Sequence, residues 1–127
     1  MISMREESVQ YFTEKEEEFA NLLIEIGMKR HVAKVLVFLA STPEATSRVI
    51  ERGTDMRQPE ISLAMNFLKD LGWIRSREKT AENKGRPTKV YELAIPVTVI
   101  IDSIEEKKKN KINNQLALIW KLRDCLR

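Results

Sequence analysis

The chain has 127 residues, 43% of them hydrophobic and 32% charged, with a formal net charge of +3. This length and apolar content favour one compact domain, and four glycines with four prolines are too few for an all-β sandwich. The charge is uneven, since residues 1–28 hold two basic and seven acidic residues, whereas residues 29–127 hold twenty basic and twelve acidic ones. A basic body is typical of proteins that bind nucleic acids.

The residue types needed for catalysis and metal binding are scarce. A single cysteine, Cys125, and a single histidine, His31, exclude an internal disulfide and a Cys- or His-rich metal site. No Ser/His/Asp or Cys/His grouping, Gly-rich phosphate loop or carboxylate pair stands out, so we expect no enzyme activity, no metal and no cofactor. No apolar run approaches the roughly 20 residues that span a membrane, and the N-terminus lacks the apolar stretch of a signal peptide. We therefore expect a cytoplasmic protein with no membrane partner.

Two helices are expected in the N-terminal third of the chain. Thr13 and Glu16 match a capping box, in which the two side chains satisfy amides at the start of a helix, and Gly27 marks the end of that helix. Residues 29–41 are dense in apolar side chains at helical spacing and stop before Pro43. This segment is predicted to be a buried central helix.

The next segment has the pattern of a helix-turn-helix. Either Thr46 or Ser47 can cap a short helix, and residues 53–55 are predicted to form a turn. Residues 57–71 then place their apolar side chains along one stripe, which predicts a second helix. Pro59 is tolerated in the first turn of that helix.

After residue 72 the hydrophobic period changes from helical spacing to two. Residues 73–79 alternate between apolar and polar side chains, as in a strand. Residues 89–93 are predicted to form a second strand that pairs with the first across a polar, exposed loop at residues 80–88. This pattern predicts a two-stranded hairpin.

Pro96 can occupy the first turn of a long helix that reaches residue 127. The β-branched run at residues 97–101 leaves open the alternative that this stretch extends the hairpin. The order of the elements predicts a mainly α fold with a small β-hairpin. This is a winged helix-turn-helix with an N-terminal helix and a long C-terminal dimerisation helix.

The second helix of a helix-turn-helix lies in the major groove and reads base edges with its N-terminal residues. Here Arg57 can pair with guanine, and Gln58 and Asn66 can pair with adenine. Glu60 can accept from the cytosine amino group, and Leu63 can touch a thymine methyl. Such side chains also occur on any solvated helix face, so by themselves they leave both interpretations open. The candidate base contacts are Arg57, Gln58, Pro59, Glu60, Ser62, Leu63 and Asn66.

The hairpin favours the DNA interpretation. Between residues 75 and 89 there are six basic and two acidic residues, and Arg75, Arg77 and Lys79 share one strand face. Such a wing can dock on phosphates, with Arg86 at its tip entering a minor groove. The alternative is that the charges only deter strand-to-strand aggregation. The candidate backbone contacts are Arg75, Arg77, Lys79, Lys84, Arg86 and Lys89.

Residues 58–65 (QPEISLAM), 68–74 (LKDLGWI) and 84–91 (KGRPTKVY) carry a family resemblance. They resemble the recognition helix, first wing strand and wing of MarR-, ArsR- and TrmB-type winged-helix regulators, most closely small archaeal ones. The resemblance covers roughly residues 29–94. It implies a dimer on a pseudo-palindromic operator, with residues 57–66 in the major groove. ArsR-type metal sensors carry a cysteine pair that this chain lacks, and residues 44–72 hold four basic against five acidic residues.

The last helix carries an apolar stripe that is interrupted at Lys108. Pairing with a second copy of the chain, together with the N-terminal helix, would bury this stripe, and the alternative is that the helix folds back on its own domain. The candidate dimerisation residues are Phe19, Leu23, Ile101, Ile104, Ile112, Leu116, Ile119 and Leu126.

We therefore expect residues 1–28 to form an N-terminal helix at the dimer interface, residues 29–95 a DNA-binding domain and residues 96–127 a dimerisation helix. The expected function is sequence-specific binding of double-stranded DNA by a homodimer that represses or activates transcription. The alternative is a winged-helix module that binds other proteins in a transcription-related assembly, for which an apolar recognition face would be the discriminating feature. The sequence identifies no small-molecule effector.

Overall fold

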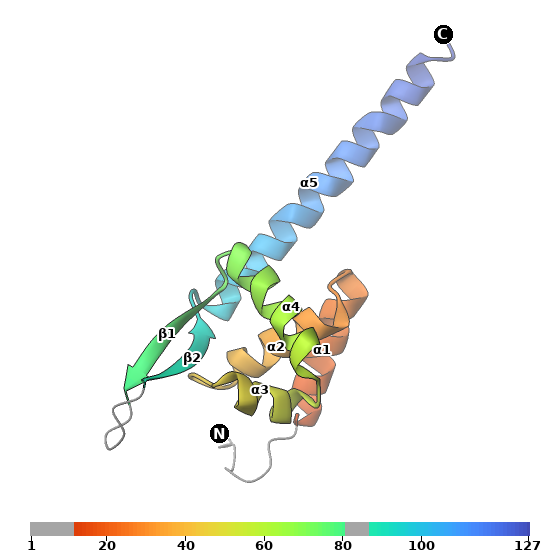
Figure 1. Ribbon diagram of the computed structural model, residues 1–127. Coiled ribbons are helices and arrows are strands. Elements are labelled where there is room, and N and C mark those ends of the chain that lie inside the picture. Colours follow the sequence, from red (N-terminus) through yellow and green to blue (C-terminus); the bar gives the residue numbers. More distant parts are fainter. Residues whose placement is uncertain (1–11, 81–86) are drawn as a thin grey trace. The chain divides into compact units, whose positions relative to one another are not determined.

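The computed structural model describes residues 12–80 and 87–127. The chain divides into two compact units, residues 1–94 and residues 95–127. Within its described residues, the first unit contains four helices and a two-stranded hairpin (Figure 1). The second unit consists mainly of one long helix. The fold is thus mainly helical, as the sequence predicts.

The first helix, α1 (Glu14–Ile26), begins at the predicted capping box. The Thr13 backbone N–H donates to Glu16 Oε1 at 2.8 Å, and the Glu16 backbone N–H donates to Thr13 Oγ1 at 3.2 Å. Gly27 ends the helix with a φ of 124°, a value that side-chain-bearing residues rarely adopt. The prediction for this helix is confirmed at both ends.

Helix α2 (Arg30–Ala40) is the centre of the first unit, and α1, α3, α4 and β2 all pack against it. Seven of its eleven residues are buried, because neighbours cover it on several sides. Val35, Val37 and Phe38 are completely buried. The predicted central helix is confirmed.

Helix α3 (Ser47–Thr54) begins at Thr46, whose hydroxyl oxygen accepts from the Val49 backbone N–H at 3.2 Å. The predicted turn at residues 53–55 is wrong in part, since Gly53 and Thr54 belong to α3 and only Asp55 ends the helix, in the left-handed conformation. The helix continues because Gly53 packs into the core and Thr54 Oγ1 donates to the Ile50 carbonyl oxygen at 2.6 Å. An aspartate tolerates the left-handed conformation better than most residues.

Helix α4 (Gln58–Asp70) follows and buries one stripe, made of Ile61, Ala64, Met65 and Leu68. The hairpin pairs β1 (Ile74–Thr80) with β2 (Pro87–Leu93) in antiparallel register, with Arg77 opposite Val90. Both strands extend further toward the loop than the sequence pattern indicated. A third segment joins the sheet at Ala45, whose backbone exchanges hydrogen bonds of 3.0 and 2.8 Å with Tyr91.

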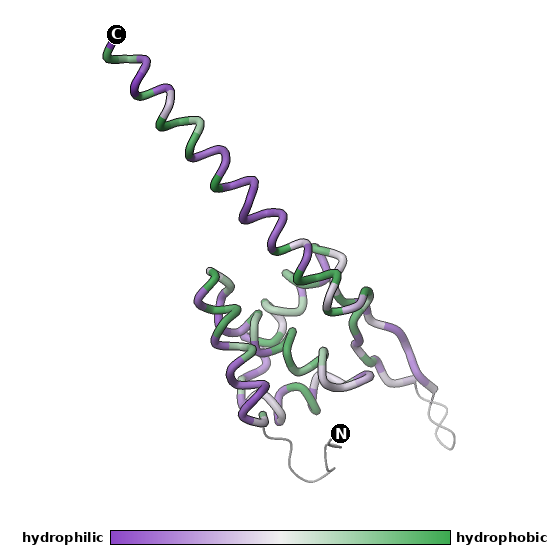
Figure 2. Tube along the Cα trace, turned by 180° about the vertical axis from the view of Figure 1, so that it is seen from behind, coloured by the Kyte–Doolittle hydropathy of each residue, from purple (hydrophilic) through white to green (hydrophobic). Residues whose placement is uncertain are grey.

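Helix α5 (Val97–Asp124) forms the second unit. Pro96 precedes the helix as its N-cap residue and does not lie in the first turn, and residues 97–101 are helical. The alternative of an extended hairpin is therefore wrong, because the helix begins directly after Pro96. The tube in Figure 2 shows apolar residues toward both ends of α5, with a hydrophilic stretch between them.

Candidate nucleic-acid interface

The exposed face of α4, together with its N-cap residue Arg57, carries all the predicted base-contacting side chains. Each of them is exposed, whereas the apolar stripe on the other side of the helix is buried. The helix positions them because its core residues recur at intervals of three and four, which leaves the intervening positions on one outward surface. The outward residues are Arg57, Gln58, Pro59, Glu60, Ser62, Leu63 and Asn66.

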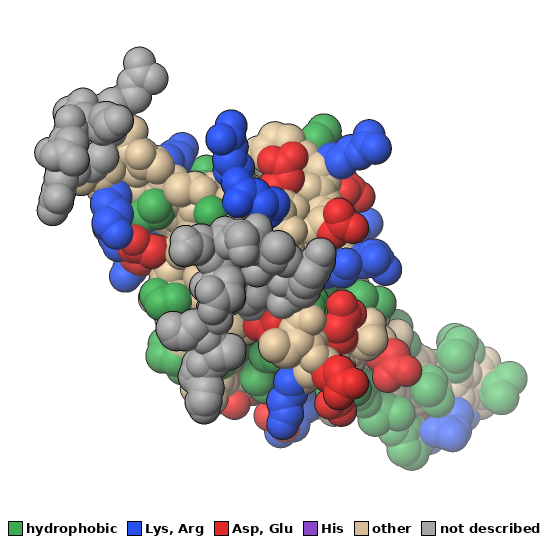
Figure 3. Space-filling model, turned by 90° about the horizontal axis from the view of Figure 1, so that it is seen from below, with side chains coloured by type: hydrophobic (Ala, Val, Ile, Leu, Met, Phe, Trp, Pro, Cys, Tyr) green, Lys and Arg blue, Asp and Glu red, His purple; other side chains and the backbone are tan. Residues whose placement is uncertain are grey.

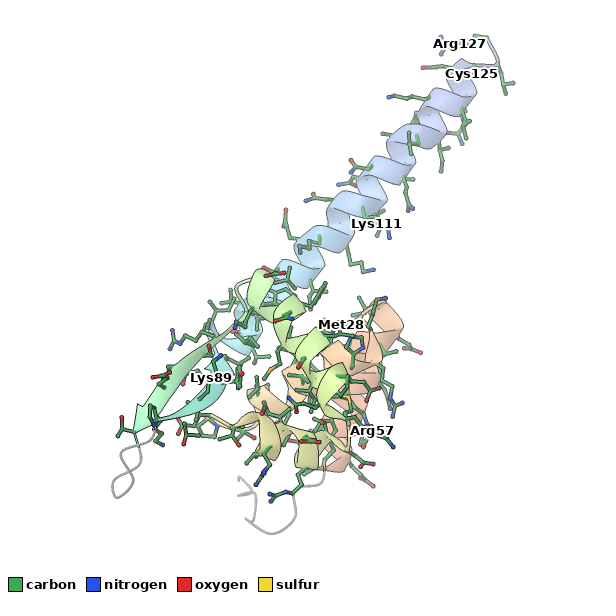
Figure 4. All side chains as sticks on the ribbon, in the orientation of Figure 1. Met28, Arg57, Lys89, Lys111, Cys125 and Arg127 are labelled. Atoms are coloured by element: carbon green, nitrogen blue, oxygen red, sulfur yellow. The ribbon has the colours of Figure 1, made fainter. Side chains whose placement is uncertain are left out.

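The N-terminal end of α4 is organised by Arg57 and Glu60. The backbone N–H of Arg57, the N-cap residue, donates to Glu60 Oε1 at 3.2 Å. One carboxylate oxygen of Glu60 is thus engaged in capping the helix. The Arg57 side chain lies at the junction of α3 and α4 (Figure 4).

Phe67 is an exposed aromatic residue on α4 that the sequence reasoning missed. Its side chain is 50% exposed, and that of Leu63, four residues earlier, is 63% exposed. Residues four apart are neighbours on a helix surface, so the two side chains form an apolar edge beside the polar residues. The four-residue spacing between Leu63 and Phe67 is the sequence signal that could have identified Phe67 as part of this surface.

Two arginines on α3 also belong to this surface and were not singled out from the sequence. Arg48 and Arg52 are exposed and lie four residues apart, opposite the buried Ile50 and Gly53. Together with Arg57 they line a shallow depression at the α3–α4 junction, to which Glu51, Asp55 and Met56 also contribute. Basic side chains project from several places on the face shown in Figure 3, and acidic side chains stand between them.

The hairpin, here called the wing, divides its basic residues between two faces. Arg75, Arg77 and Lys79 share one face, as predicted from their alternation. Lys89 pairs with Glu78 in the register and therefore lies on the opposite face. The stick view shows Lys89 on the wing (Figure 4). Lys84 and Arg86, predicted for the wing tip, lie outside the described residues.

The three cations on the first wing face are paired with two carboxylates, and we call these five residues the wing charge cluster. Glu92 accepts from Arg75 Nε at 2.8 Å and from Arg77 Nε at 3.3 Å. Glu44 accepts from Arg77 and from Lys79. The sequence reasoning missed both carboxylates, because Glu44 lies 33 and 35 positions from its partners and no local pattern connects them.

The cluster holds both carboxyl groups in the ionised form. The hydrogen bond from Lys79 lowers the pKa of Glu44 below its ordinary value, and the charges of Lys79 and Arg77 add to this effect. The hydrogen bond from Arg75 lowers the pKa of Glu92, with smaller contributions from Arg77. Burial acts to raise the pKa of both groups, but the hydrogen bonds and charges lower it by more.

The predicted dimerisation residues fall into three groups. Ile101, Ile112, Leu116 and Ile119 of α5, and Leu126 just after it, are 42–88% exposed, and Ile104 is half-buried. On α1, Phe19 is half-buried. Leu23 is only 4% exposed and is already part of the core of the first unit. The exposed apolar residues of α1 are instead Leu22 and Ile26.

Two further observations concern metal binding and membrane spanning in the described part of the chain. Within residues 12–80 and 87–127, no three His, Cys, Asp or Glu side chains come together in a group that could hold a metal ion. No helix in the same residues combines the length and the apolar character needed to cross a bilayer.

Helices α2, α3 and α4 form a three-helix unit in which α3 and α4 are the helix-turn-helix, and a two-stranded wing follows them. This arrangement defines a winged-helix protein. A possible transcriptional regulator from Methanosarcina mazei Go1 is similar in fold, with a TM-score of 0.55 and 9% identity over 75% of this chain and 82% of that chain. A MarR-family transcription regulator is also similar, with a TM-score of 0.51 and 20% identity over 88% of this chain and 78% of that chain. No protein-family model and no curated protein matches the sequence. The fold is thus a winged helix, similar to that of the MarR-family transcription regulator.

Proposed function

We propose that this protein is a transcription regulator that binds double-stranded DNA as a homodimer. The observation that carries the proposal is the outward surface of α4. This is the second helix of the helix-turn-helix, and all seven predicted base-contacting side chains are exposed on it or on its N-cap residue. The two similar structures, both named as established or possible transcription regulators, support the same function.

Base reading is assigned to the N-terminal half of α4. The guanidinium of Arg57 can pair with guanine, and the amides of Gln58 and Asn66 can each pair with adenine. Ser62 can donate to or accept from either kind of base. Glu60 keeps one carboxylate oxygen for the cytosine amino group while the other caps the helix. These groups are chemically sufficient to distinguish base pairs in a major groove.

Phosphate contacts are assigned to two basic groups on the same unit. Arg48 and Arg52 project from α3, the helix that crosses the DNA backbone in a helix-turn-helix. Arg75, Arg77 and Lys79 project from the wing and remain 45–62% exposed beside their carboxylate partners. Contacts of this kind fix the position of a protein on a duplex and make binding depend on salt.

Dimerisation is assigned to α5. Residues 111–127 are all exposed, and seven large apolar side chains among them are 42–88% exposed. A helix with this much uncovered apolar surface requires a partner. A second copy supplies a stripe of the same length and character, and a symmetric pair suits an operator made of two half-sites. The seven residues are Ile112, Leu116, Leu118, Ile119, Trp120, Leu122 and Leu126.

The proposal is tested by measuring duplex binding at several salt concentrations. The wild-type protein is expected to bind a random duplex with an affinity that falls linearly on a log–log plot as salt rises. Selection of bound duplexes from a random pool is expected to return two half-sites in inverted repeat, at a spacing that reflects the dimer. Absence of salt-sensitive binding at low salt would contradict the proposal.

The second candidate function is a protein-interaction module, and one observation favours it. Leu63 and Phe67 form an exposed apolar edge on α4, and an exposed aromatic residue of this kind also suits a contact with a protein partner. The remainder of the outward face is polar, so DNA binding remains the proposed function. Replacement of Phe67 by Ser separates the two candidates, because it would abolish a protein contact at this edge while leaving random-duplex binding intact.

A further inference from the structure

The wing charge cluster contains more than cations. All three of its basic side chains hydrogen-bond to Glu44 or Glu92. We propose that Glu44 and Glu92 compete with DNA phosphates for these cations and thereby limit the affinity of the protein for DNA of any sequence. This inference rests on the proposed DNA-binding function and adds a regulating element to it.

The geometry places the carboxylates behind the cations. The side chains of Glu44 and Glu92 are 24% and 14% exposed, whereas those of Arg75, Arg77 and Lys79 are 62%, 45% and 58% exposed. An approaching phosphate therefore meets the basic groups first. It shares them with carboxylates that occupy part of their hydrogen-bonding capacity, most of all at Arg77, which serves both acids.

The backbone holds Glu44 in this position. Ala45 pairs with Tyr91 in the sheet, and the antiparallel register places the preceding residue, Glu44, beside Glu92. The two acids consequently lie next to each other on the face that carries the cations. Because Glu44 belongs to a segment fixed by two backbone hydrogen bonds, it stays within reach of Arg77 and Lys79 when DNA approaches.

The charge balance gives the direction of the effect. The cluster holds three cations and two carboxylates, so its net charge is +1. Replacing either acid by the isosteric glutamine raises the net charge to +2 and releases donors toward phosphate. The slope of log affinity against log salt becomes steeper by about 0.9 for each additional phosphate that is neutralised.

The experiment compares Glu44→Gln and Glu92→Gln with Glu25→Gln, which changes the net charge equally from the outward face of α1. Each protein is titrated with a random duplex over a range of salt concentrations. Both wing variants are expected to bind about three- to tenfold more tightly at low salt with a steeper slope, whereas Glu25→Gln stays within about twofold of wild type. The affinity of both wing variants for a selected operator is expected to rise by the same factor, because phosphate contacts carry no sequence information.

A double-mutant cycle separates competition from a purely structural role. If Glu44 restrains Lys79, the loss of affinity caused by Lys79→Ala is larger in the Glu44→Gln background than in wild type. Equal losses in the two backgrounds would overturn the inference, as would wing variants that bind no more tightly than wild type. Failure of the wild-type protein to bind any duplex would instead overturn the proposed function, so the two failures are distinguishable.

Discussion

Gly53 of α3 lies directly against the ring of Phe38 of α2, so closely that a Cβ atom on residue 53 would overlap the ring edge. Both residues are buried, and Phe38 is completely inaccessible to solvent. The contact sets how closely α3 approaches α2, and α4 follows directly after α3. The position of the outward face of α4 therefore depends on a residue that has no side chain.

Replacing Gly53 by Ala is expected to destabilise the fold. Overpacking of a filled core costs about 1–3 kcal/mol, which exceeds the gain of at most about 1 kcal/mol from the better helix propensity of alanine. The free energy of unfolding, measured by denaturant titration, is the quantity to compare with wild type.

A second substitution identifies the cause of that loss. Phe38→Leu shortens the ring side chain, so it is expected to recover part of the stability lost in Gly53→Ala. It should recover none in Gly72→Ala, where φ is +77° and no atom lies within 4 Å of the added Cβ. Strictly additive effects of the substitutions at residues 38 and 53 would contradict the proposed overlap.

Gln58 and Arg48 are expected to contribute to DNA binding in different ways. Gln58→Ala removes a candidate base contact, so it should relax sequence preference by about 1–3 kcal/mol at one base pair and leave random-duplex affinity unchanged. Arg48→Ala removes a candidate phosphate contact, so it should weaken binding to all duplexes and reduce the salt slope by about 1. Equal losses on operator and random duplex for both variants would contradict this division.

Acidification is expected to destabilise the wing. The pKa values of Glu44 and Glu92 are lowered in the folded protein, so their contribution to stability is complete above the unfolded-state carboxyl pKa of about 4.3. It is lost as the pH falls through the lower folded-state values. Melting temperatures measured from pH 7 to pH 3 should therefore fall less steeply for Glu44→Gln/Glu92→Gln than for wild type. An identical pH profile for the two proteins would show that the ion pairs contribute nothing in solution.

An acidic substitution on the apolar side of α5 is expected to prevent dimerisation. Ile119→Asp places a charge among the exposed apolar side chains, and burying an unpaired carboxylate in a dimer is unfavourable. Light scattering should show a change from the mass of a dimer to that of a monomer. Asn110→Asp introduces the same charge among polar neighbours on the helix and should remain dimeric. A wild-type protein that is monomeric at micromolar concentration would contradict the proposed role of α5.

The helices could be predicted from the sequence because their signals are local. The capping box at Thr13 and Glu16 spans four residues, and the apolar stripe of α4 recurs within two turns. Six of the seven predicted base contacts lie on α4 and follow directly from the same periodicity, and the seventh, Arg57, is its N-cap residue. The end of α3 was harder to locate, because Gly53 reads as a turn residue until its contact with Phe38 is known.

The electrostatics of the wing could not be predicted in the same way. The alternation of residues 75–79 places three cations on one face, but nothing local shows that Glu44 reaches them. That contact depends on the pairing of Ala45 with Tyr91, two residues that lie far apart in the chain. Leu23 shows a similar limit, since its apolar character fits both an interface and a core, and only its burial against neighbouring elements decides between them.

The two backbone hydrogen bonds between Ala45 and Tyr91 also have a mechanical consequence. They fasten β2 to the segment that connects α2 and α3, so the base of the wing cannot swing away from the helices without breaking the sheet. The distance between the base of the wing and α4 is therefore fixed before any duplex arrives. Under the proposed DNA-binding function, sequences that differ in groove width or stiffness would have to adapt to the protein, and the energy needed to deform each duplex would become part of its affinity. Base pairs that no side chain touches would in this way still influence which sites are occupied.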